Sequence, residues 1–148
     1  MEGSSSGHRV VHSFRRIRDV IFVDTNVFMY AVGRDHPLKK PARDFFEQSL
    51  ADRTPLVTSA EVLQELLHAY LPVGRIEILD AAFFLADERM SRIWSVEPED
   101  VKMARLLILS NRGLKPRDLL HLACCRRRDV TRIHTYDQGL AAATRAEG

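Results

Sequence analysis

The sequence is poor in cysteine: its 148 residues include only Cys124 and Cys125, which are adjacent. Adjacent thiols are badly placed to bridge distant segments, because a disulfide requires two suitably oriented backbone positions. Both cysteines lie within an apolar helical pattern, which favours reduced thiols in the core over a redox or zinc-binding role. A chain of this length can bury a sizeable hydrophobic core, so it requires neither a disulfide scaffold nor a structural metal.

Long apolar runs and an excess of one charge are also missing. No apolar run approaches the roughly 20 residues that span a bilayer. No signal-peptide segment follows the basic start, so we expect a cytoplasmic protein without a membrane segment. The 22 Lys and Arg residues nearly balance 20 Asp and Glu residues, for a net charge of +2. This balance excludes the strongly basic proteins that coat nucleic acids.

The small net charge lies at the N-terminus. Residues 1–19 are rich in Gly and Ser and contain four Arg against one Glu and one Asp, whereas 18 basic and 18 acidic residues follow from residue 20 onward. We predict that residues 1–19 form a flexible basic N-terminal arm and that residues 20–148 form one domain. The arm is a cloning remnant, an upstream start or a segment that touches nucleic acid, and the sequence leaves these three open.

From residue 20 onward, short β-favouring segments alternate with amphipathic helical patterns. Strands are predicted at residues 20–23, 56–58, 93–96 and 131–136. Helices are predicted at residues 26–32, 38–51, 59–71, 75–90, 98–113 and 116–128, and after Asp137. Strands separated by helices indicate an α/β fold with a parallel sheet and helices on both faces. In such sheets the ligand site lies beyond the carboxyl ends of the strands.

Two groups of charged residues are assigned to helix ends. Glu99 and Asp100 follow Pro98 in the first turn of one helix, and three arginines at positions 126–128 end another. Acids at a helix start and bases at a helix end both suit the helix dipole. For the arginines this interpretation is favoured over an RNA-binding patch.

Acidic residues occur where the predicted strands end. Asp24 directly follows the most apolar strand, where a buried carboxylate is costly unless it is compensated. Its alternative role is to cap the next helix. On the helix after the second strand, Glu61 is expected to close a capping box with Thr58. Glu65 has no such role and lies near the edge of the apolar face of that helix, so it is the better candidate for a functional carboxylate.

Two further acids are predicted near the same edge. Asp118 lies in the first turn of the helix that begins at Pro116, where the helix dipole favours an ionised carboxylate. Asp137 directly follows the fourth strand. Each could serve only as a helix-terminal residue. His121, one turn after Asp118, could reach the same rim, although a lone helical histidine is more often structural.

Four acids therefore converge on one edge of the predicted sheet. They are Asp24, Glu65, Asp118 and Asp137. Like charges ~5 Å apart repel by roughly 3 kcal/mol per pair at an effective dielectric constant near 20. A carboxylate cluster without lysine needs a cation or extra protons to offset this repulsion. Oxygen ligands suit Mg²⁺ or Mn²⁺, and the absence of a Cys and His ligand set argues against zinc.

The acids lie in four short motifs. The motifs are Val23-Asp24-Thr25-Asn26-Val27, Ser59 with Glu65-Leu66-Leu67, Asp118-Leu119-Leu120-His121-Leu122-Ala123, and Thr135-Tyr136-Asp137. In order and approximate spacing they resemble the motifs of PIN-domain ribonucleases, and most closely those of the VapC toxins of bacterial and archaeal toxin–antitoxin pairs. The resemblance covers about residues 20–143, which is nearly the whole chain except the basic arm.

The resemblance implies a three-layer α/β/α sandwich around a central parallel sheet, usually dimeric and inhibited by a VapB-type antitoxin. It also implies a metal-dependent endoribonuclease that cleaves RNA with Mg²⁺ or Mn²⁺. The metal-binding acids would be Asp24, Glu65, Asp118 and Asp137. Asn26 and Ser59 occupy motif positions that support the site through hydrogen bonds. The chain departs from the family pattern in two places. Residues 138–140 stand where the family usually has acidic or aromatic residues after the last aspartate, which makes Asp137 the least secure ligand. The basic N-terminal arm is also atypical of the family.

Basic residues near the acids are candidates for RNA contacts, with solvated surface charge as the equal alternative. One group consists of Arg112, Lys115 and Arg117. A second group consists of Arg34, His36, Lys39 and Lys40. For a second copy of the chain or an antitoxin, the candidate surface consists of Phe83, Phe84 and residues 71–74. Core packing is the favoured role of most of these apolar side chains.

Two other classes of protein remain open on sequence alone. A phosphatase of the haloacid-dehalogenase type also has an aspartate after its first strand, but that chemistry needs a second aspartate two residues later, where this chain has Asn26. The other class is a PIN-like module that binds RNA or protein without cutting it. The presence of acids at all four motif positions argues against such a module.

Overall fold

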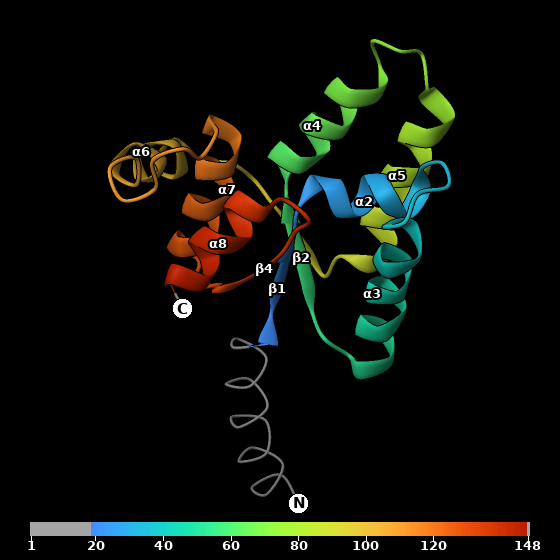
Figure 1. The fold of residues 1–148 in the computed structure, drawn as a ribbon, viewed down its shortest axis with the longest axis horizontal. Coiled ribbons are helices and arrows are strands. Elements are labelled where there is room, and N and C mark those ends of the chain that lie inside the picture. The colour runs from blue at the N-terminus through green and yellow to red at the C-terminus, as the bar shows by residue number, and fades with distance from the viewer. Residues whose placement is uncertain (1–18, 148) are drawn as a thin grey trace, which may run out of the picture.

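Four strands of the described chain form a parallel sheet in the order β3-β2-β1-β4 (Figure 1). The structure is a computed structural model and describes residues 19–147. Its strands are β1 (Ile21–Val23), β2 (Leu56–Ser59), β3 (Arg92–Trp94) and β4 (Arg132–His134). The arm predicted for residues 1–19 lies outside the described residues except for Asp19.

Helices cover both faces of this sheet. On one side lie α2 (Thr25–Val32), α3 (Lys39–Asp52), α4 (Ala60–Tyr70) and α5 (Ile76–Arg89). On the other side lie α6 (Pro98–Leu106), α7 (Pro116–Arg127) and α8 (Gln138–Glu147). The predicted three-layer α/β/α arrangement is thereby confirmed. Each of the described helices falls short of the length and apolarity needed to cross a bilayer.

β1 is an inner strand and is buried along its whole length. It pairs with β2 on one side, where Ile21 aligns with Leu56, and with β4 on the other, where Phe22 aligns with Ile133. Helices cover both faces of β1, which explains its uninterrupted apolar sequence. The strand ends at Val23, and the backbone N–H of the next residue, Asp24, donates to the carbonyl oxygen of His134 in β4 at 3.0 Å. The chain therefore leaves the sheet beside the end of β4.

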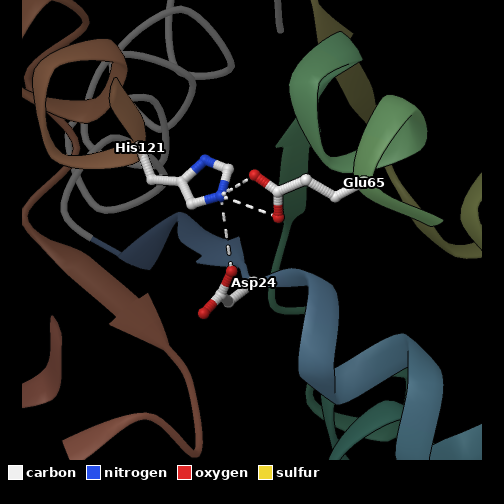
Figure 2. A group of neighbouring side chains, drawn as sticks. All are labelled: Asp24, Glu65 and His121. Carbon is white, nitrogen blue, oxygen red and sulfur yellow. Dashed lines mark hydrogen bonds and ion pairs between the residues drawn. The ribbon is translucent and has the colours of Figure 1, made fainter. Parts of the chain in front are cut away.

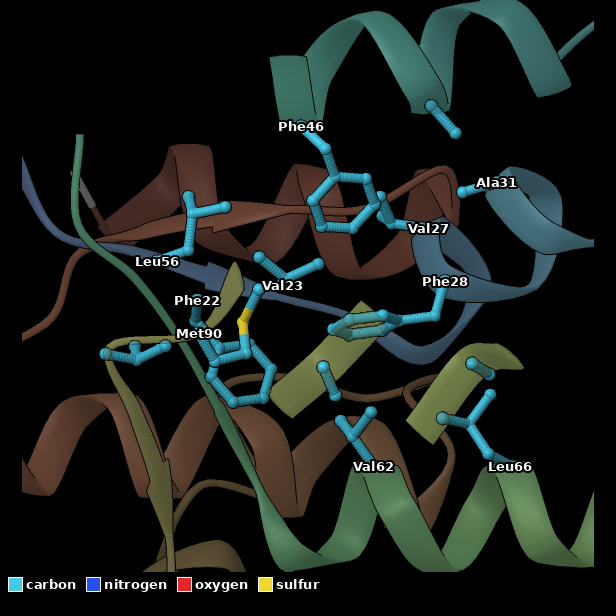
Figure 3. Packing of buried hydrophobic residues seen from close by; sticks show 14 of the residues in the cluster. Phe22, Val23, Val27, Phe28, Ala31, Phe46, Leu56, Val62, Leu66 and Met90 are labelled. Carbon is cyan, nitrogen blue, oxygen red and sulfur yellow. The ribbon is translucent and has the colours of Figure 1, made fainter. Parts of the chain in front are cut away.

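The main hydrophobic core lies between the sheet and helices α2 to α5 (Figure 3). The rings of Phe28 and Phe46, from α2 and α3, pack with their centroids 5.5 Å apart. Val62 and Leu66 contribute from α4 and are fully buried. A smaller core packs beneath α6 and α7 and consists of Leu107, Leu119, Leu122 and Ala123. These two cores fix α4 and α7, which carry predicted acids, against the sheet.

The two cysteines are buried in α7, as predicted. Burial, together with the nearby charge of Asp100, raises the pKa of Cys124 to about 12. The Cys124 thiol therefore stays protonated at neutral pH, which makes it a poor nucleophile and a poor metal ligand. A packing role explains its position.

The helix predicted over residues 98–113 ends at Leu106. The side chains of Ser110 and Asn111 both donate to the carbonyl oxygen of Leu107, at 3.5 and 3.0 Å. In a continuing helix this carbonyl oxygen would accept a hydrogen bond from a backbone N–H, and here the two side chains replace that donor. The segment then turns through Gly113, whose φ of +96° is a conformation that favours glycine. Short polar side chains thus end the helix about two turns earlier than predicted.

The capping box predicted for Thr58 and Glu61 is wrong. Strand β2 continues through Thr58, whose hydroxyl donates across the sheet to the carbonyl oxygen of Val23 at 2.9 Å. A capping box is present instead at the start of α6, between Glu97 and Asp100. Because the sheet takes the Thr58 hydroxyl, Glu61 is left available to the functional site.

Candidate active site

A pocket of about 520 Å³ opens at the carboxyl end of the sheet and includes every acid predicted for the site. The four acids are Asp24, Glu65, Asp118 and Asp137. The first follows β1, the second lies on α4, the third lies on α7 and the last follows β4. All strands are parallel, so the segments that leave their carboxyl ends meet at one edge. The topology therefore brings together acids that are far apart in sequence.

Asp24 is almost completely buried. Its Oδ1 accepts a hydrogen bond from the backbone N–H of Thr25 at 2.7 Å and caps α2. Its Oδ2 accepts a second hydrogen bond from the hydroxyl of Thr135, also at 2.7 Å. These hydrogen bonds compensate the cost of burying the carboxylate. The two roles considered for Asp24, helix cap and site residue, are therefore compatible in one side chain.

Glu65 extends from α4 toward the same position. The hydroxyl of Thr25 donates a short hydrogen bond to Glu65 Oε1, and the Nε2 atom of His121 lies 3.1 Å from Glu65 Oε2. Burial works against ionisation of Glu65, but the hydrogen bonds from His121 and Thr25 outweigh it and hold the pKa of Glu65 below its ordinary value. Glu65 is therefore an anion at neutral pH.

His121 completes a buried cluster with Asp24 and Glu65 (Figure 2). Its side chain has no exposed surface, and its Nε2 lies 3.5 Å from Asp24 Oδ1. Burial works against the charged ring, but the hydrogen bond to Glu65 and the neighbouring carboxylate charges outweigh it and raise the pKa of His121. Sequence reasoning favoured a purely structural histidine. The sequence feature that indicates a place near the acids is its position three residues after Asp118, which puts both residues on the same face of α7.

Asp118 is also buried, with 6% of its surface exposed. Burial raises the pKa of its carboxyl group, and the negative charges of Asp137 and Asp24 raise it further. His121 and Arg117 offset part of this repulsion. The acids of the pocket are therefore close enough to destabilise one another's ionised forms, a repulsion that a bound cation would relieve.

Glu61 also lines the pocket, although sequence reasoning assigned it elsewhere. Burial raises the pKa of Glu61, and the charge of Glu65 raises it further. The signal that could have identified Glu61 is its spacing from Glu65, because two acids four residues apart lie on the same face of a helix and repel each other. Glu61 adds a fifth carboxyl group to the pocket.

Asp137 borders the pocket and directly precedes α8. Its Oδ1 accepts hydrogen bonds from the backbone N–H groups of Gly139 at 2.9 Å and Leu140 at 3.4 Å. A Cβ atom at position 139 would lie 3.3 Å from this oxygen, so glycine leaves room for the carboxylate. The unusual sequence at residues 138–140 therefore accommodates Asp137 at the edge of the pocket.

A family model described as PIN domain matches residues 21–146. The chain is also 61% identical over 127 residues to Ribonuclease VapC23 of Mycobacterium tuberculosis, a match that covers 86% of this chain and 100% of the relative. The chain belongs to the VapC family of PIN-domain ribonucleases. It is 38% identical over 120 residues to Ribonuclease VapC13 of the same organism, covering 81% of this chain and 92% of the relative. The family predicted from the four motifs is confirmed.

Solved structures share the fold of this VapC-family chain. Mycobacterium tuberculosis VapC20, described as a sarcin-ricin loop cleaving toxin, matches with a TM-score of 0.62 at 22% identity, covering 83% of this chain and 94% of that chain. VapBC2 from Rickettsia felis, bound to a DNA fragment from its promoter, matches with a TM-score of 0.62 at 16% identity, covering 80% and 87%. The family match and the shared fold identify a PIN domain, so the hypothesis of a haloacid-dehalogenase-type phosphatase is rejected.

Asn26 links two of the segments that form the pocket of this PIN domain. Its Nδ2 donates to the hydroxyl of Thr135 at 3.3 Å, and its Oδ1 accepts from the backbone N–H of Tyr136 at 3.2 Å. The Thr135 hydroxyl donates to Asp24 and accepts from the backbone N–H of Asp137 at 3.0 Å. Sequence reasoning gave Thr135 no role of its own. Ser59, the other predicted supporting residue, is different, because its buried Oγ has no hydrogen-bond partner among the described residues.

Arg117 is the one predicted RNA-contacting arginine that borders the acid pocket within residues 19–147. Its side chain is exposed, and its positive charge favours the ionised forms of Glu61 and Glu65. Arg112 and Lys115 are exposed on the connection between α6 and α7 and do not border this pocket. Of this predicted group, one basic residue therefore lies beside the acids and the other two lie outside the pocket.

The second basic group follows α2. Arg34 and His36 line a neighbouring cavity of about 540 Å³. The Nζ atom of Lys39 donates to a backbone carbonyl oxygen at 2.7 Å, and Lys40 pairs with Asp44 at 2.8 Å. Local pairing of this kind on an exposed helix fits the solvated-charge alternative for the two lysines.

The donor atoms of the pocket fit a divalent cation. One carboxylate oxygen each of Asp24 and Glu65 and a ring nitrogen of His121 lie within 4.8 Å of one another. Asp118 is close enough to Asp24 for the charge of Asp24 to raise the pKa of Asp118. Carboxylate oxygens are the preferred ligands of hard ions such as Mg²⁺ and Mn²⁺. The chemistry of this donor set therefore matches the divalent metal that PIN-domain nucleases generally use.

Proposed function

We propose that this chain is an endoribonuclease that requires Mg²⁺ or Mn²⁺ and acts as the toxin of a VapBC-type toxin–antitoxin pair. The observation that carries the proposal is the convergence of Asp24, Glu65 and Asp118 in one pocket of a chain from a ribonuclease family. The proposed substrate is RNA, and the proposed site of action is the cytoplasm.

The acids have distinct proposed roles. Asp24 and Asp118 would hold the ion, and Glu65 would act as a further ligand or as the base that orients the attacking water. Asp137 commits one oxygen to the start of α8, so its other oxygen would contact the ion directly or through water. When bound, Mg²⁺ or Mn²⁺ lowers the pKa of a coordinated water and stabilises charge on the phosphate. The pocket therefore needs no nucleophilic side chain.

Arg117 is the proposed phosphate-binding residue at the rim. Its exposed guanidinium lies beside the acids, where it can donate hydrogen bonds to a phosphate of the substrate. A cation in the pocket supplies the remaining positive charge where the phosphate binds. The balanced charge of residues 20–148 therefore does not oppose RNA as the substrate.

An RNA cleavage assay tests this function. We expect the wild-type protein to cleave RNA with Mn²⁺ and to lose the activity in EDTA. Asp24→Asn should lower the rate by ~100-fold or more while the circular dichroism spectrum is kept, because asparagine has the same size but no charge to offer the ion. Asp87→Asn, an exposed acid on α5, is the matched control and should cleave normally. Cleavage by Asp24→Asn at the wild-type rate would contradict the proposal.

The proposed partners are a VapB-type antitoxin and a second copy of the chain. Leu71 and Val73, in the connection between α4 and α5, are 55% and 64% exposed, and Phe84, within α5, is 66% exposed. Core packing was the favoured role for these side chains, and the structure shows that they do not have it. Exposed apolar groups on α5 and the connection before it support a protein interface there. Expression of the chain should arrest bacterial growth, and co-expression of a small antitoxin gene from directly upstream should restore growth.

A further inference from the structure

His121 is the one histidine of the described chain that lies inside the acid cluster. We infer that it is a positioning residue: the N–H group at its Nε2 holds the carboxylates of Asp24 and Glu65 together for a cation, and the ring itself is not a metal ligand. This inference rests on the proposed function, because it concerns the same metal site.

Packing fixes the His121 ring before any ion binds. The ring has no exposed surface and lies against Phe22 of β1, with centroids 5.4 Å apart. Phe22 in turn stacks on Trp94 of β3, with centroids 5.7 Å apart. The sheet therefore determines where Nε2 lies, and a ring held by packing cannot turn to exchange its two nitrogens without displacing the core.

The other ring nitrogen decides where the proton is. Nδ1 of His121 is buried and has no hydrogen-bond partner among residues 19–147. A buried N–H without an acceptor is unfavourable, so the neutral ring carries its proton on Nε2. A histidine that binds a metal through Nε2 needs the opposite arrangement, with a lone pair on Nε2 and an Nδ1–H donated to an acceptor. The surroundings of His121 lack that acceptor within the described residues.

The protonated Nε2 faces both carboxylates (Figure 2). It lies 3.1 and 3.4 Å from the two oxygens of Glu65 and 3.5 Å from Asp24 Oδ1. One donor therefore spans two anions that come from different segments of the fold, the connection after β1 and helix α4. Without it, repulsion would push the Glu65 and Asp24 side chains apart, and the ion would have to draw them back together. Such preorganisation by a residue beside the ligands increases metal affinity.

Two substitutions separate the donor from the ring. His121→Phe keeps an aromatic ring but removes the donor, whereas His121→Gln keeps an N–H at a similar reach. We expect His121→Phe to weaken Mn²⁺ binding by ~10–100-fold, and His121→Gln to restore most of it, as measured by titration of the free protein without RNA. His36→Phe, an exposed histidine outside the acid pocket, should bind Mn²⁺ normally. Unchanged Mn²⁺ affinity in His121→Phe would overturn the inference.

Spectroscopy distinguishes positioning from ligation. Electron spin-echo spectra of the Mn²⁺-loaded wild-type protein should show no directly coordinated histidine nitrogen. Nitrogen-15 NMR of the metal-free protein should show the proton of His121 on Nε2. A coordinated nitrogen, or a proton on Nδ1 alone, would overturn this inference while leaving the metal-dependent nuclease standing. Failure of the wild-type protein to bind Mn²⁺ would instead overturn the proposed function and this inference together.

Discussion

Arg128, at the end of α7, holds the fully buried carboxylate of Asp100 in the first turn of α6 by two hydrogen bonds of 2.7 and 3.1 Å. Arg127 adds a third hydrogen bond at 2.7 Å. The guanidinium of Arg128 also lies over the ring of Trp94 at 4.9 Å. From the sequence alone, the predicted role of these arginines is to interact favourably with the helix dipole at the end of α7. In the fold they tie α6 to α7, the helix that carries Asp118.

Substitution of Asp100 should destabilise the domain. Asp100→Asn removes the charge between two arginines and should lower the free energy of unfolding by about 3–5 kcal/mol, the range for loss of one partner from a buried ion pair. Urea unfolding monitored by circular dichroism measures this change. Glu99→Gln, an exposed acid in the same helical turn, is the control and should change stability by less than about 0.5 kcal/mol. Equal unfolding midpoints for the two variants would contradict the assigned role.

The same ion pair predicts how stability depends on pH. Burial opposes ionisation of Asp100, but hydrogen bonds from Arg128, the Glu97 backbone and Arg127 outweigh it and hold the pKa of Asp100 well below its ordinary value. Its contribution to stability is therefore present above the ordinary Asp pKa of about 3.9 and is lost as the pH falls toward the lowered value. The wild-type free energy of unfolding should fall more steeply than that of Asp100→Asn below about pH 4. Parallel pH profiles would rule this out.

Asp118 predicts the opposite effect in the metal-free protein. Burial and the charges of Asp137 and Asp24 raise the pKa of Asp118, so its ionised form destabilises the fold at neutral pH. In EDTA at pH 7, Asp118→Asn should therefore melt higher than the wild type, by roughly 2–4 °C for an effect of about 1 kcal/mol. The difference should vanish in acid, below the ordinary Asp pKa, where both proteins carry a neutral group. Calorimetry checks both conditions, and a lower melting temperature for the variant at pH 7 would contradict the repulsion.

Divalent cations should stabilise the wild-type protein. An ion that binds only the folded state stabilises it by about 2.7 kcal/mol at 100 times its dissociation constant. We expect Mg²⁺ and Mn²⁺ to raise the melting temperature of the wild type and to have little effect on Asp24→Asn. KCl at equal ionic strength is the control, because salt also screens repulsion between acids. Equal shifts with KCl and MnCl₂ would remove the evidence for a specific ion.

Thr135 should be required for full activity although it carries no charge. Its hydroxyl donates to Asp24 and accepts from Asn26 and the Asp137 backbone. Thr135→Val should lower Mn²⁺-dependent RNA cleavage by ~10–100-fold, the effect typical of residues that orient metal ligands. Thr135→Ser retains the hydroxyl and should recover most of the rate. A serine variant as impaired as the valine variant would indicate a packing defect instead.

Much of the site was predictable because it depends on local patterns and one topological rule. The short apolar strands and the acids that follow two of them can be recognised from a few neighbouring residues, as for β1 and Asp24. Parallel strands then place those acids at one edge, whatever the distance between them in sequence. The errors arose where a polar side chain had two available partners. The hydroxyl of Thr58 donates a hydrogen bond to β1 and does not cap α4. The side chain of Asn111 donates to the carbonyl oxygen of Leu107, and α6 ends early.

The sequence by itself determined the α/β class and the family and singled out the four acids that line the pocket, because hydrophobic periodicity and short motifs are properties of neighbouring residues. Only the tertiary structure decided how those acids are held. The proximity of His121 to Glu65 joins residues that are 56 positions apart, and the two hydrogen bonds of Thr135 with Asp24 and Asn26 join segments from both ends of the domain. Such contacts depend on how whole layers pack, so they have no signature in local sequence.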